Sequence, residues 1–330
     1  MDRAKKLAER VFTLQTPDDF RGLAMDVFHF QYENNNVYQT FCDALRVSPA
    51  DVTTIEEIPF LPVELFRSGR VKSFDEEAAI IFESSGTTGS EPSFHAVKDL
   101  GLYEKSFVHS FRRFYGEPSS WCILALLPSY LERKGSSLVY MAKRLIDLSG
   151  HPDGGFYLND LAGMAEKLKS LMQKDQPVLL LGVSFALLDL AEQYPMPLTN
   201  TVVMETGGMK GRRREMIREE LHHVLCSAFQ QERIHSEYGM TELLSQAYSQ
   251  GDGKFASPPW LRILIRDSND PLTMAGHQRT GGINVIDLAN IYSCSFIATG
   301  DLGRTYPDGH FEVLGRFDNS DVRGCNLMVG

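Results

Sequence analysis

Short apolar runs alternate with amphipathic, helix-length segments through the middle of the chain. The runs read AAIIF, WCILALL, PVLLLG, TVVMET and RIHSEYG, and the helix-like segments cover residues 103–115, 136–148, 184–193 and 212–229. Strands that alternate with helices predict an α/β fold in which helices flank a layered sheet. This pattern constrains the fold more than any other feature of the sequence.

The two flanks of this stretch have different patterns. Residues 18–47 combine aromatic and polar residues in a helical pattern that Pro49 ends. Beyond Trp260, strand-like runs such as LRILIRD and HFEVLG are separated by turn residues, with no clear amphipathic helix between them. We therefore expect a helical N-terminal region over 1–77, an α/β core over 78–255, a smaller β-rich subdomain over 256–317 and a short hinge and tail over 318–330.

Composition excludes several classes of protein. The 330 residues are 43% hydrophobic, enough for one large domain or two joined subdomains. No run approaches the roughly 18 apolar residues of a membrane span, and the N-terminus lacks the apolar stretch of a secretory signal, so we expect a cytoplasmic protein. The formal charge of −10 argues against a nucleic-acid partner. The five scattered cysteines show no CxxC spacing, which argues against a disulfide framework or a zinc site.

A loop rich in glycine and hydroxyl residues follows the run AAIIFE. It comprises Ser84, Ser85, Gly86, Thr87, Thr88 and Gly89. Glycines let a backbone wrap closely and present its N–H groups, and hydroxyls add further donors, so such a loop can hold phosphates. It is not a P-loop, because no Gly-Lys-Ser/Thr follows. By composition alone a solvated turn is the commoner case.

Four further segments follow the loop in order. They are Gly207 and Gly208 in ETGGMK, Tyr238, Gly239, Thr241 and Glu242 in YGMTE, Asp301 in TGD, and Arg316 in GRFD. The YGMTE segment follows a strand-like run and is expected to precede a helix. Each segment alone is no more specific than a turn or a helix start.

Taken together and in order, the five segments resemble the motifs of the adenylate-forming superfamily, which includes acyl-CoA synthetases, peptide-synthetase adenylation domains and luciferases. The resemblance implies the large-domain fold of that superfamily, layered sheets with flanking helices plus a β-rich subdomain, and makes residues 78–255 the nucleotide-binding core. It also implies a role for each segment. The 84–89 loop would hold the ATP phosphates, Thr241 would contact the α-phosphate, and Glu242 would hold Mg²⁺. Gly207 and Gly208 would form a turn against the adenine, and the Tyr238 ring would stack on the adenine. Asp301 would accept hydrogen bonds from the ribose hydroxyls, and Arg316 would approach the nucleotide.

The sequence departs from the superfamily after its hinge. Full-length members continue for about a hundred residues and carry a lysine there that binds the carboxylate and the α-phosphate, whereas this chain stops at Gly330. We therefore expect the mobile C-terminal domain to be missing or reduced to a tail. Lys98 and Lys210 are candidates to replace the lysine, although a surface lysine is the commoner case. The phosphate loop also lacks the Pro-Lys that usually follows its last glycine. His95 lies nearby and is either a hydrogen-bond donor or a packing residue.

The last residues narrow the resemblance. The segment around Cys325, with LLPSYLER and SSLVYMAKRL, resembles the acyl-protein synthetases of bacterial fatty-acid reductase complexes, the LuxE-type luciferin-component ligases. In that family a cysteine near the C-terminus accepts the acyl group and hands it to a reductase subunit. Cys325 next to Arg323 and Gly324 suits this role, because a thiolate attacks an acyl-adenylate well. The other four cysteines lie in apolar or helical runs and are expected to be buried and inert.

The resemblance implies ATP-dependent activation of a carboxylic acid, expected to be a fatty acid, to acyl-AMP, with ATP and Mg²⁺ as cofactors and transfer to Cys325. The expected partner is an acyl reductase subunit or an acyl carrier. Two alternatives stay open. One is an acyl-CoA or acyl-carrier ligase whose C-terminal domain is a separate polypeptide, and the other is a non-catalytic nucleotide-binding scaffold.

Overall fold

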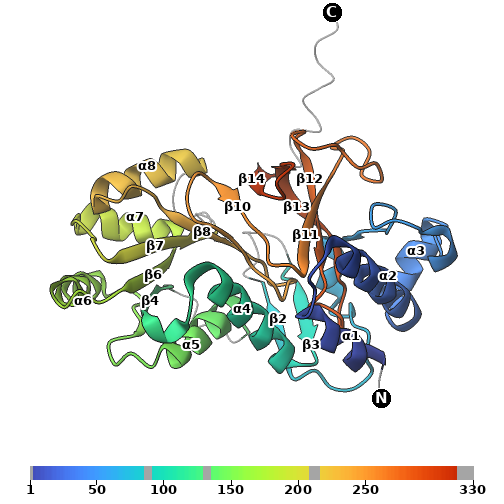
Figure 1. The fold of residues 1–330 in the computed structure, drawn as a ribbon, viewed down its shortest axis with the longest axis horizontal. Coiled ribbons are helices and arrows are strands. Elements are labelled where there is room, and N and C mark those ends of the chain that lie inside the picture. The colour runs from blue at the N-terminus through green and yellow to red at the C-terminus, as the bar shows by residue number, and fades with distance from the viewer. Residues whose placement is uncertain (1–2, 85–90, 129–134, 208–215, 318–330) are drawn as a thin grey trace, which may run out of the picture.

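A computed structural model describes residues 3–84, 91–128, 135–207 and 216–317 (Figure 1). Three helices open the chain: α1 (Arg3–Val11), α2 (Pro17–Asn34) and α3 (Asn36–Ala44). The helical pattern expected over 18–47 is thus two helices, because Asn35 ends α2 and its side chain accepts the first N–H groups of α3. Short 3₁₀ turns at Pro49–Asp51 and Val63–Ser68 surround β1 (Leu61–Pro62).

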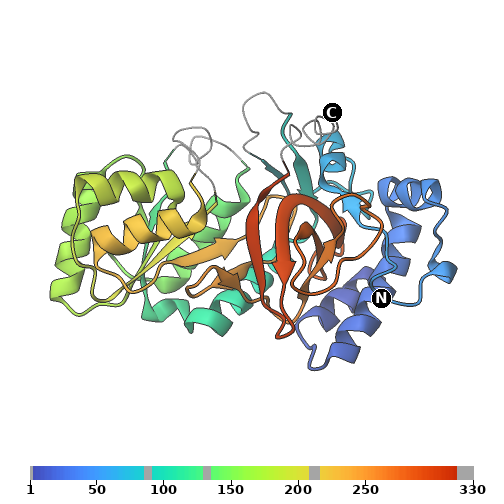
Figure 2. The same ribbon diagram turned by 90° about the horizontal axis from the view of Figure 1, so that it is seen from above.

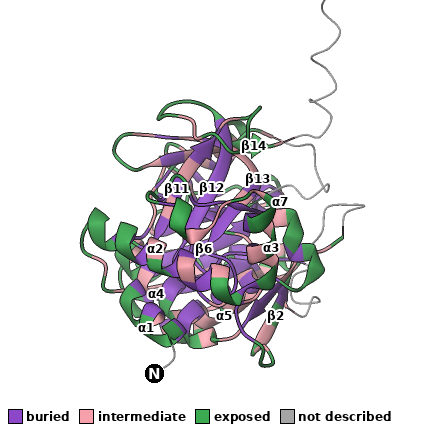
Figure 3. Ribbon diagram, turned by 90° about the vertical axis from the view of Figure 1, so that its right-hand side faces the viewer, coloured by how far each residue is buried: buried purple, intermediate pink, exposed green. Residues whose placement is uncertain are grey.

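A mainly parallel sheet forms the middle of the molecule. Its order is β5 (Gly155–Phe156), β4 (Cys122–Leu126), β6 (Val178–Val183), β7 (Thr201–Thr206), β8 (His235–Tyr238) and β9 (Ala247–Ser249), with only β9 antiparallel to its neighbour. Every residue of β4 and β6 is buried, as expected for parallel strands covered on both faces (Figure 3). The predicted layered α/β fold is confirmed.

Five helices connect or flank these strands. They are α4 (Leu100–Tyr115), α5 (Ser137–Ser149), α6 (Leu161–Gln173), α7 (Ser184–Gln193) and α8 (Arg218–Phe229), with a 3₁₀ turn at Pro118–Ser120 before β4. Helix α6 was not predicted from the sequence. The helix predicted over 212–229 begins only at Arg218 within the part of the chain that the structure describes, since Met216 and Ile217 precede it without helical structure.

The run AAIIF forms a strand, but not in the parallel sheet. It is β2 (Ile80–Glu83), which pairs only with β3 (Phe94–Val97) as an antiparallel hairpin. Three of the four residues of β2 are exposed or half-exposed, unlike the fully buried central strands, which explains its place outside that sheet. The hairpin brackets the glycine-rich and hydroxyl-rich loop.

The last third of the chain forms a second, antiparallel sheet. Its order is β10 (Lys254–Phe255), β14 (Phe311–Arg316), β13 (Phe296–Thr305), β12 (Gly281–Asp287) and β11 (Leu261–Arg266), and β1 pairs in parallel with β13. Figures 1 and 2 show this sheet between the parallel sheet on one side and helices α1–α3 on the other. The β-rich segment expected beyond Trp260 therefore forms strands as predicted, and the N-terminal region contributes one strand to the same sheet.

Residues after the YGMTE segment do not form the helix that the sequence suggested. They turn back through 243–246 into β9, and the buried carboxylate of Asp287 accepts hydrogen bonds from the N–H groups of Leu244 (2.8 Å) and Ser245 (3.0 Å). The Ser245 hydroxyl donates to the same carboxylate at 2.5 Å. A helix would have to give up these three bonds, so the tertiary contact with β12 overrides the local helical preference.

Candidate functional site

The structure brings Tyr238, Asp301 and Arg316 together from two different sheets. Tyr238 ends β8 in the parallel sheet, and its hydroxyl donates to Asp301 Oδ2 on β13 at 2.9 Å. Arg316 on β14 lies directly opposite Asp301 in the antiparallel pairing and directs its Nε to Asp301 Oδ1 at 3.3 Å. Tyr238 and Asp301, predicted for the nucleoside end of the site, and Arg316, predicted to approach the nucleotide, therefore lie in one cluster.

Aromatic side chains fix the position of the Tyr238 ring. The ring packs edge-on against Phe255 and Phe311, with centroids 6.0 and 5.6 Å apart, and is only 8% exposed. Burial and the adjacent Asp301 carboxylate raise the pKa of Tyr238 well above its usual range, so the hydroxyl stays a donor. A ring held in this way offers a preorganised surface for a planar ligand.

The backbone of Thr241 and Glu242 is held from outside the motif. The carbonyl oxygen of Thr241 lies 2.8 Å from His95 Nδ1, and the carbonyl oxygen of Glu242 accepts from the side-chain amide of Asn290 at 2.7 Å. His95 comes from β3 and Asn290 from the turn after β12, so three separate segments meet at these two motif residues.

The Glu242 carboxyl is buried, with the residue 4% exposed. Burial raises its pKa, while hydrogen bonding from Ser93 and the charge of Arg316 act in the opposite direction. Among the described residues, no lysine or arginine forms an ion pair with this carboxyl. A buried carboxyl oxygen without a lysine or arginine ion-pair partner among the described residues suits a hard divalent cation.

No group of three or more potential metal ligands occurs in the described part of the chain. Mg²⁺ commonly takes one or two protein carboxylates and completes its shell with water and substrate phosphates. One carboxylate, Glu242, therefore fits a cation that arrives with a nucleotide.

Ser84 and Ser93 close the base of the predicted phosphate loop. The Ser84 N–H donates to the Ser93 carbonyl at 3.0 Å, and the Ser93 N–H donates to the Ser84 hydroxyl oxygen at 2.8 Å. Because Ser93 also bonds to Glu242, the loop begins and ends beside the predicted cation ligand. The other predicted loop residues, Ser85, Gly86, Thr87, Thr88 and Gly89, lie outside the described residues.

The turn after β7 contributes Thr206 and Gly207. Gly207 adopts φ of 27°, in the region that favours glycine, and its predicted neighbour Gly208 lies outside the described residues. The Thr206 hydroxyl donates to the buried carboxyl of Glu237 at 2.5 Å. A methyl group at Gly239 would collide with that same carboxyl, which explains the glycine after Tyr238.

The pKa values of two buried glutamates in this region shift in opposite directions. Burial raises the pKa of Glu237 to about 7, because only Thr206 opposes it and the nearby Glu205 adds repulsion. For Glu205, burial is outweighed by the His222 side chain and the charge of Arg218, so its pKa is lowered.

Glu237, Asn290 and Ser93 were not predicted as site residues from the sequence. Of these three, only Asn290 has a sequence pattern that could have indicated a functional role, because it is a polar residue inside the apolar run DLANIYS.

The remaining candidates stand as follows. Lys98 forms an ion pair with Glu76 at 2.8 Å and lies over the rings of Phe74 and Tyr292, which accounts for its charge without a substrate. Lys210 and Cys325 lie outside the described residues. Of the other cysteines, Cys42, Cys122 and Cys294 are buried with raised pKa values, as expected, whereas Cys226 is partly exposed.

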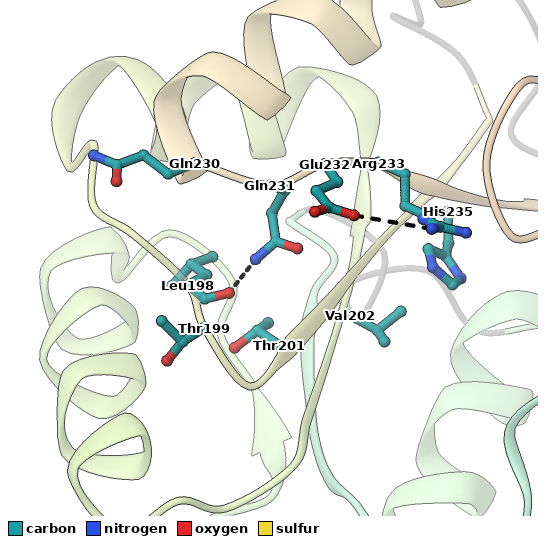
Figure 4. Close-up of a pocket in the computed structure, with 9 residues that line it drawn as sticks. All are labelled: Leu198, Thr199, Thr201, Val202, Gln230, Gln231, Glu232, Arg233 and His235. Carbon is teal, nitrogen blue, oxygen red and sulfur yellow. Dashed lines mark hydrogen bonds and ion pairs between the residues drawn. The ribbon is translucent and has the colours of Figure 1, made fainter.

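An open hollow of about 370 Å³ lies elsewhere on the parallel sheet (Figure 4). Its lining includes Thr201 and His235, which begin β7 and β8, whereas Thr206 and Tyr238 end those strands. Ligands of open α/β sheets bind outside the carboxyl ends of the strands. The hollow is therefore at the wrong end of the sheet for the predicted nucleotide, and we place the candidate site by its chemistry.

No helix among the described residues is long and apolar enough to cross a membrane.

Comparisons with known proteins bear on the fold and on the class of protein. No protein-family model matches the chain. A long-chain-fatty-acid–luciferin-component ligase of Vibrio harveyi is 21% identical over 334 residues, which cover 93% of this chain and 86% of that protein.

Solved structures share the fold. ATP-bound MatB from Rhodopseudomonas palustris matches 74% of this chain with a TM-score of 0.55 and 17% sequence identity. The structure of 2-hydroxyisobutyryl-CoA ligase in complex with 2-HIB-AMP and CoA matches 96% of this chain with a TM-score of 0.69 and 12% sequence identity. The matches span 50% and 69% of those two chains. The match with MatB thus spans about half the length of that protein.

The chain therefore shares the fold of these ligase structures and is similar to a luciferin-component ligase, in agreement with the resemblance drawn from the sequence.

Proposed function

We propose that this chain is an ATP-dependent, AMP-forming carboxylate ligase. The observation that carries the proposal is the cluster in which Tyr238, Asp301 and Arg316 meet beside Glu242 and the base of the 84–93 loop. In this assignment the Tyr238 ring stacks on the adenine. Asp301 releases its hydrogen bonds with Tyr238 and Arg316 and accepts hydrogen bonds from the ribose hydroxyls instead.

In the first step, a carboxylate oxygen of the acid attacks the α-phosphorus of ATP. The bond from that phosphorus to the bridging oxygen breaks, pyrophosphate leaves, and acyl-AMP remains. Thr241 donates to the α-phosphate, and the N–H and hydroxyl groups of the 84–89 loop hold the departing phosphates. Mg²⁺ held by Glu242 supplies charge neutralisation when it is bound.

In the second step, the Cys325 thiolate attacks the acyl carbon, AMP leaves with the electron pair of the broken bond, and a thioester on the protein results. A low-pKa thiolate is required, and Arg323 beside Cys325 in the sequence favours it. The product is then passed to an acyl reductase subunit or an acyl carrier. The proposed substrate is a fatty acid, since the Vibrio relative is named for a long-chain fatty acid.

Intact-mass spectrometry tests substrate, reaction and nucleophile together. After incubation with MgATP and a mixture of fatty acids, we expect a mass increase equal to one acyl group, which hydroxylamine removes and which maps to the peptide containing Cys325. Cys325→Ser should abolish the adduct and leave ATP–pyrophosphate exchange intact. Cys226→Ser is the matched control, because Cys226 is the partly exposed cysteine in the described part of the chain.

An acyl-CoA ligase is the second candidate, favoured by the 2-hydroxyisobutyryl-CoA ligase structure, which holds CoA. It predicts that Cys325→Ser keeps full turnover when CoA is supplied. Absence of pyrophosphate exchange with every acid, together with retained ATP binding, would instead favour a nucleotide-binding scaffold.

A further inference from the structure

His95 is fully buried between the phosphate-loop hairpin and the YGMTE segment. Both ring nitrogens face hydrogen-bond acceptors: Nδ1 lies 2.8 Å from the carbonyl oxygen of Thr241, and Nε2 lies 3.0 Å from Oδ1 of Asn290. The edge of the Phe66 ring packs against the imidazole, with centroids 5.8 Å apart. The ring therefore has one orientation available to it.

Asn290 completes the arrangement. Its Nδ2 donates to the carbonyl oxygens of Glu242 at 2.7 Å and Cys294 at 2.9 Å. A flipped amide would turn its oxygen toward two carbonyl oxygens, so these contacts fix the amide orientation. Asn290 is itself held by the buried Gln31 of α2, whose Nε2 donates to the Asn290 carbonyl at 3.0 Å.

The two side chains thus hold consecutive backbone carbonyls of the motif, His95 that of Thr241 and Asn290 that of Glu242. They come from segments 195 residues apart, and each also contacts the other. Rotation of either peptide group would redirect the Thr241 hydroxyl or the Glu242 carboxyl.

We propose that His95 and Asn290 act as one positioning unit that aims Thr241 at the α-phosphate and Glu242 at the cation. The proposal rests on the proposed function above. Neither side chain contacts the reacting atoms in it, and both act through the backbone of the motif. Partners that orient a metal ligand in this way affect affinity or rate by about 10- to 100-fold in other proteins.

Because both atoms that face the ring are acceptors, a neutral imidazole with one N–H can donate in only one of the two contacts, and the position of the proton decides which contact is a hydrogen bond. Burial lowers the pKa of His95 to about 4, against the opposing effect of its bonds to Thr241 and Asn290, so near pH 7 the ring is neutral and has one N–H. We assign that proton to Nδ1, because the Thr241 contact is the shorter of the two. An asparagine places its amide N–H near Nδ1, whereas a glutamine places it near Nε2, so these two variants separate the contacts.

The test compares His95→Asn, His95→Gln, His95→Ala, Asn290→Ala and the double variant H95A/N290A. His223→Ala is the matched control, because His223 is exposed on α8. The measurements are kcat and KM for ATP and acid in pyrophosphate exchange, ATP binding by calorimetry with and without Mg²⁺, and thermal unfolding. His95→Gln and His95→Ala should lower kcat by about 50-fold with KM for the acid unchanged, while His95→Asn should stay within about 5-fold of the wild type.

Calorimetry should show that His95→Ala loses most of the gain in ATP affinity that Mg²⁺ gives the wild type. The double variant should be no worse than either single variant, because the two residues act as one unit. Equal effects of Asn and Gln, multiplied losses in the double variant, or a His95→Ala protein with normal kcat and Mg²⁺ dependence would each overturn the proposal. If His95→Ala does not fold, the Asn and Gln variants still decide it. A wild-type protein that binds no ATP would overturn the proposed function instead.

Discussion

The two ends of the parallel sheet differ in chemistry although they belong to the same strands. At the carboxyl ends, Thr206, Glu237 and Tyr238 lead into buried polar contacts that reach the second sheet. At the amino ends, Thr201 and His235 line an open hollow with exposed neighbours such as Glu232 (Figure 4). We therefore place the candidate site by its buried and mutually positioned polar groups and not by the volume of a hollow.

The largest effect is expected at the carboxyl end, for Glu242→Gln. The substitution keeps the shape of the side chain but removes the charge that a cation needs, so kcat for pyrophosphate exchange should fall by roughly 100- to 1,000-fold. Thermal unfolding should be unchanged or raised, because a neutral group is easier to bury. Wild-type activity in this variant would show that Glu242 is not the cation ligand.

The second effect concerns the nucleoside end, through Asp301→Asn. An amide is a weaker acceptor than a carboxylate, so KM for ATP should rise by about 10- to 100-fold with a smaller change in kcat. Tyr238→Phe serves as the control, since it removes the Tyr238–Asp301 bond while keeping the ring. If both variants raise KM equally, Asp301 matters only as the partner of Tyr238.

The third effect is on stability, for Glu237→Gln. The Glu237 carboxyl titrates near 7 in the fold and near 4.5 in an unfolded chain. Between these values the folded protein keeps a proton that the unfolded chain has lost, so the stability it contributes is complete below pH 4.5 and declines as pH rises through 7. The shift corresponds to roughly 3 kcal/mol at most.

Glu237→Gln removes this decline, so its midpoint of thermal unfolding should exceed that of the wild type by several degrees at pH 8.5. At pH 5 the two proteins should differ little. A difference that does not depend on pH would mean that Glu237 is ionised in the fold, and would contradict the assigned charge state.

The smallest effect is expected at the amino end. Glu232→Ala and Arg233→Ala change exposed side chains of the hollow and should leave kcat and KM within about 2-fold of the wild type. A loss of activity comparable to that of Asp301→Asn would reverse the comparison and make the hollow part of the functional site.

The sequence alone indicated the alternation of strands and helices in the core, apart from α6, and the motifs of the candidate nucleotide site. Apolar runs predict buried parallel strands because both faces of such a sheet are covered, and the short motifs carry their residue types in a fixed order. This was enough to predict Tyr238, Asp301 and Arg316 together, although the first and last of them are 78 positions apart in the sequence.

The tertiary structure decided what local pattern cannot encode. It moved AAIIF into a separate hairpin, replaced the helix expected after Glu242 by a turn bound to Asp287, and brought His95 and Asn290 to the Thr241 and Glu242 carbonyls. Each of these depends on hydrogen bonds between segments far apart in the chain, whose partners are set by the packing of the two sheets and not by neighbours in the sequence.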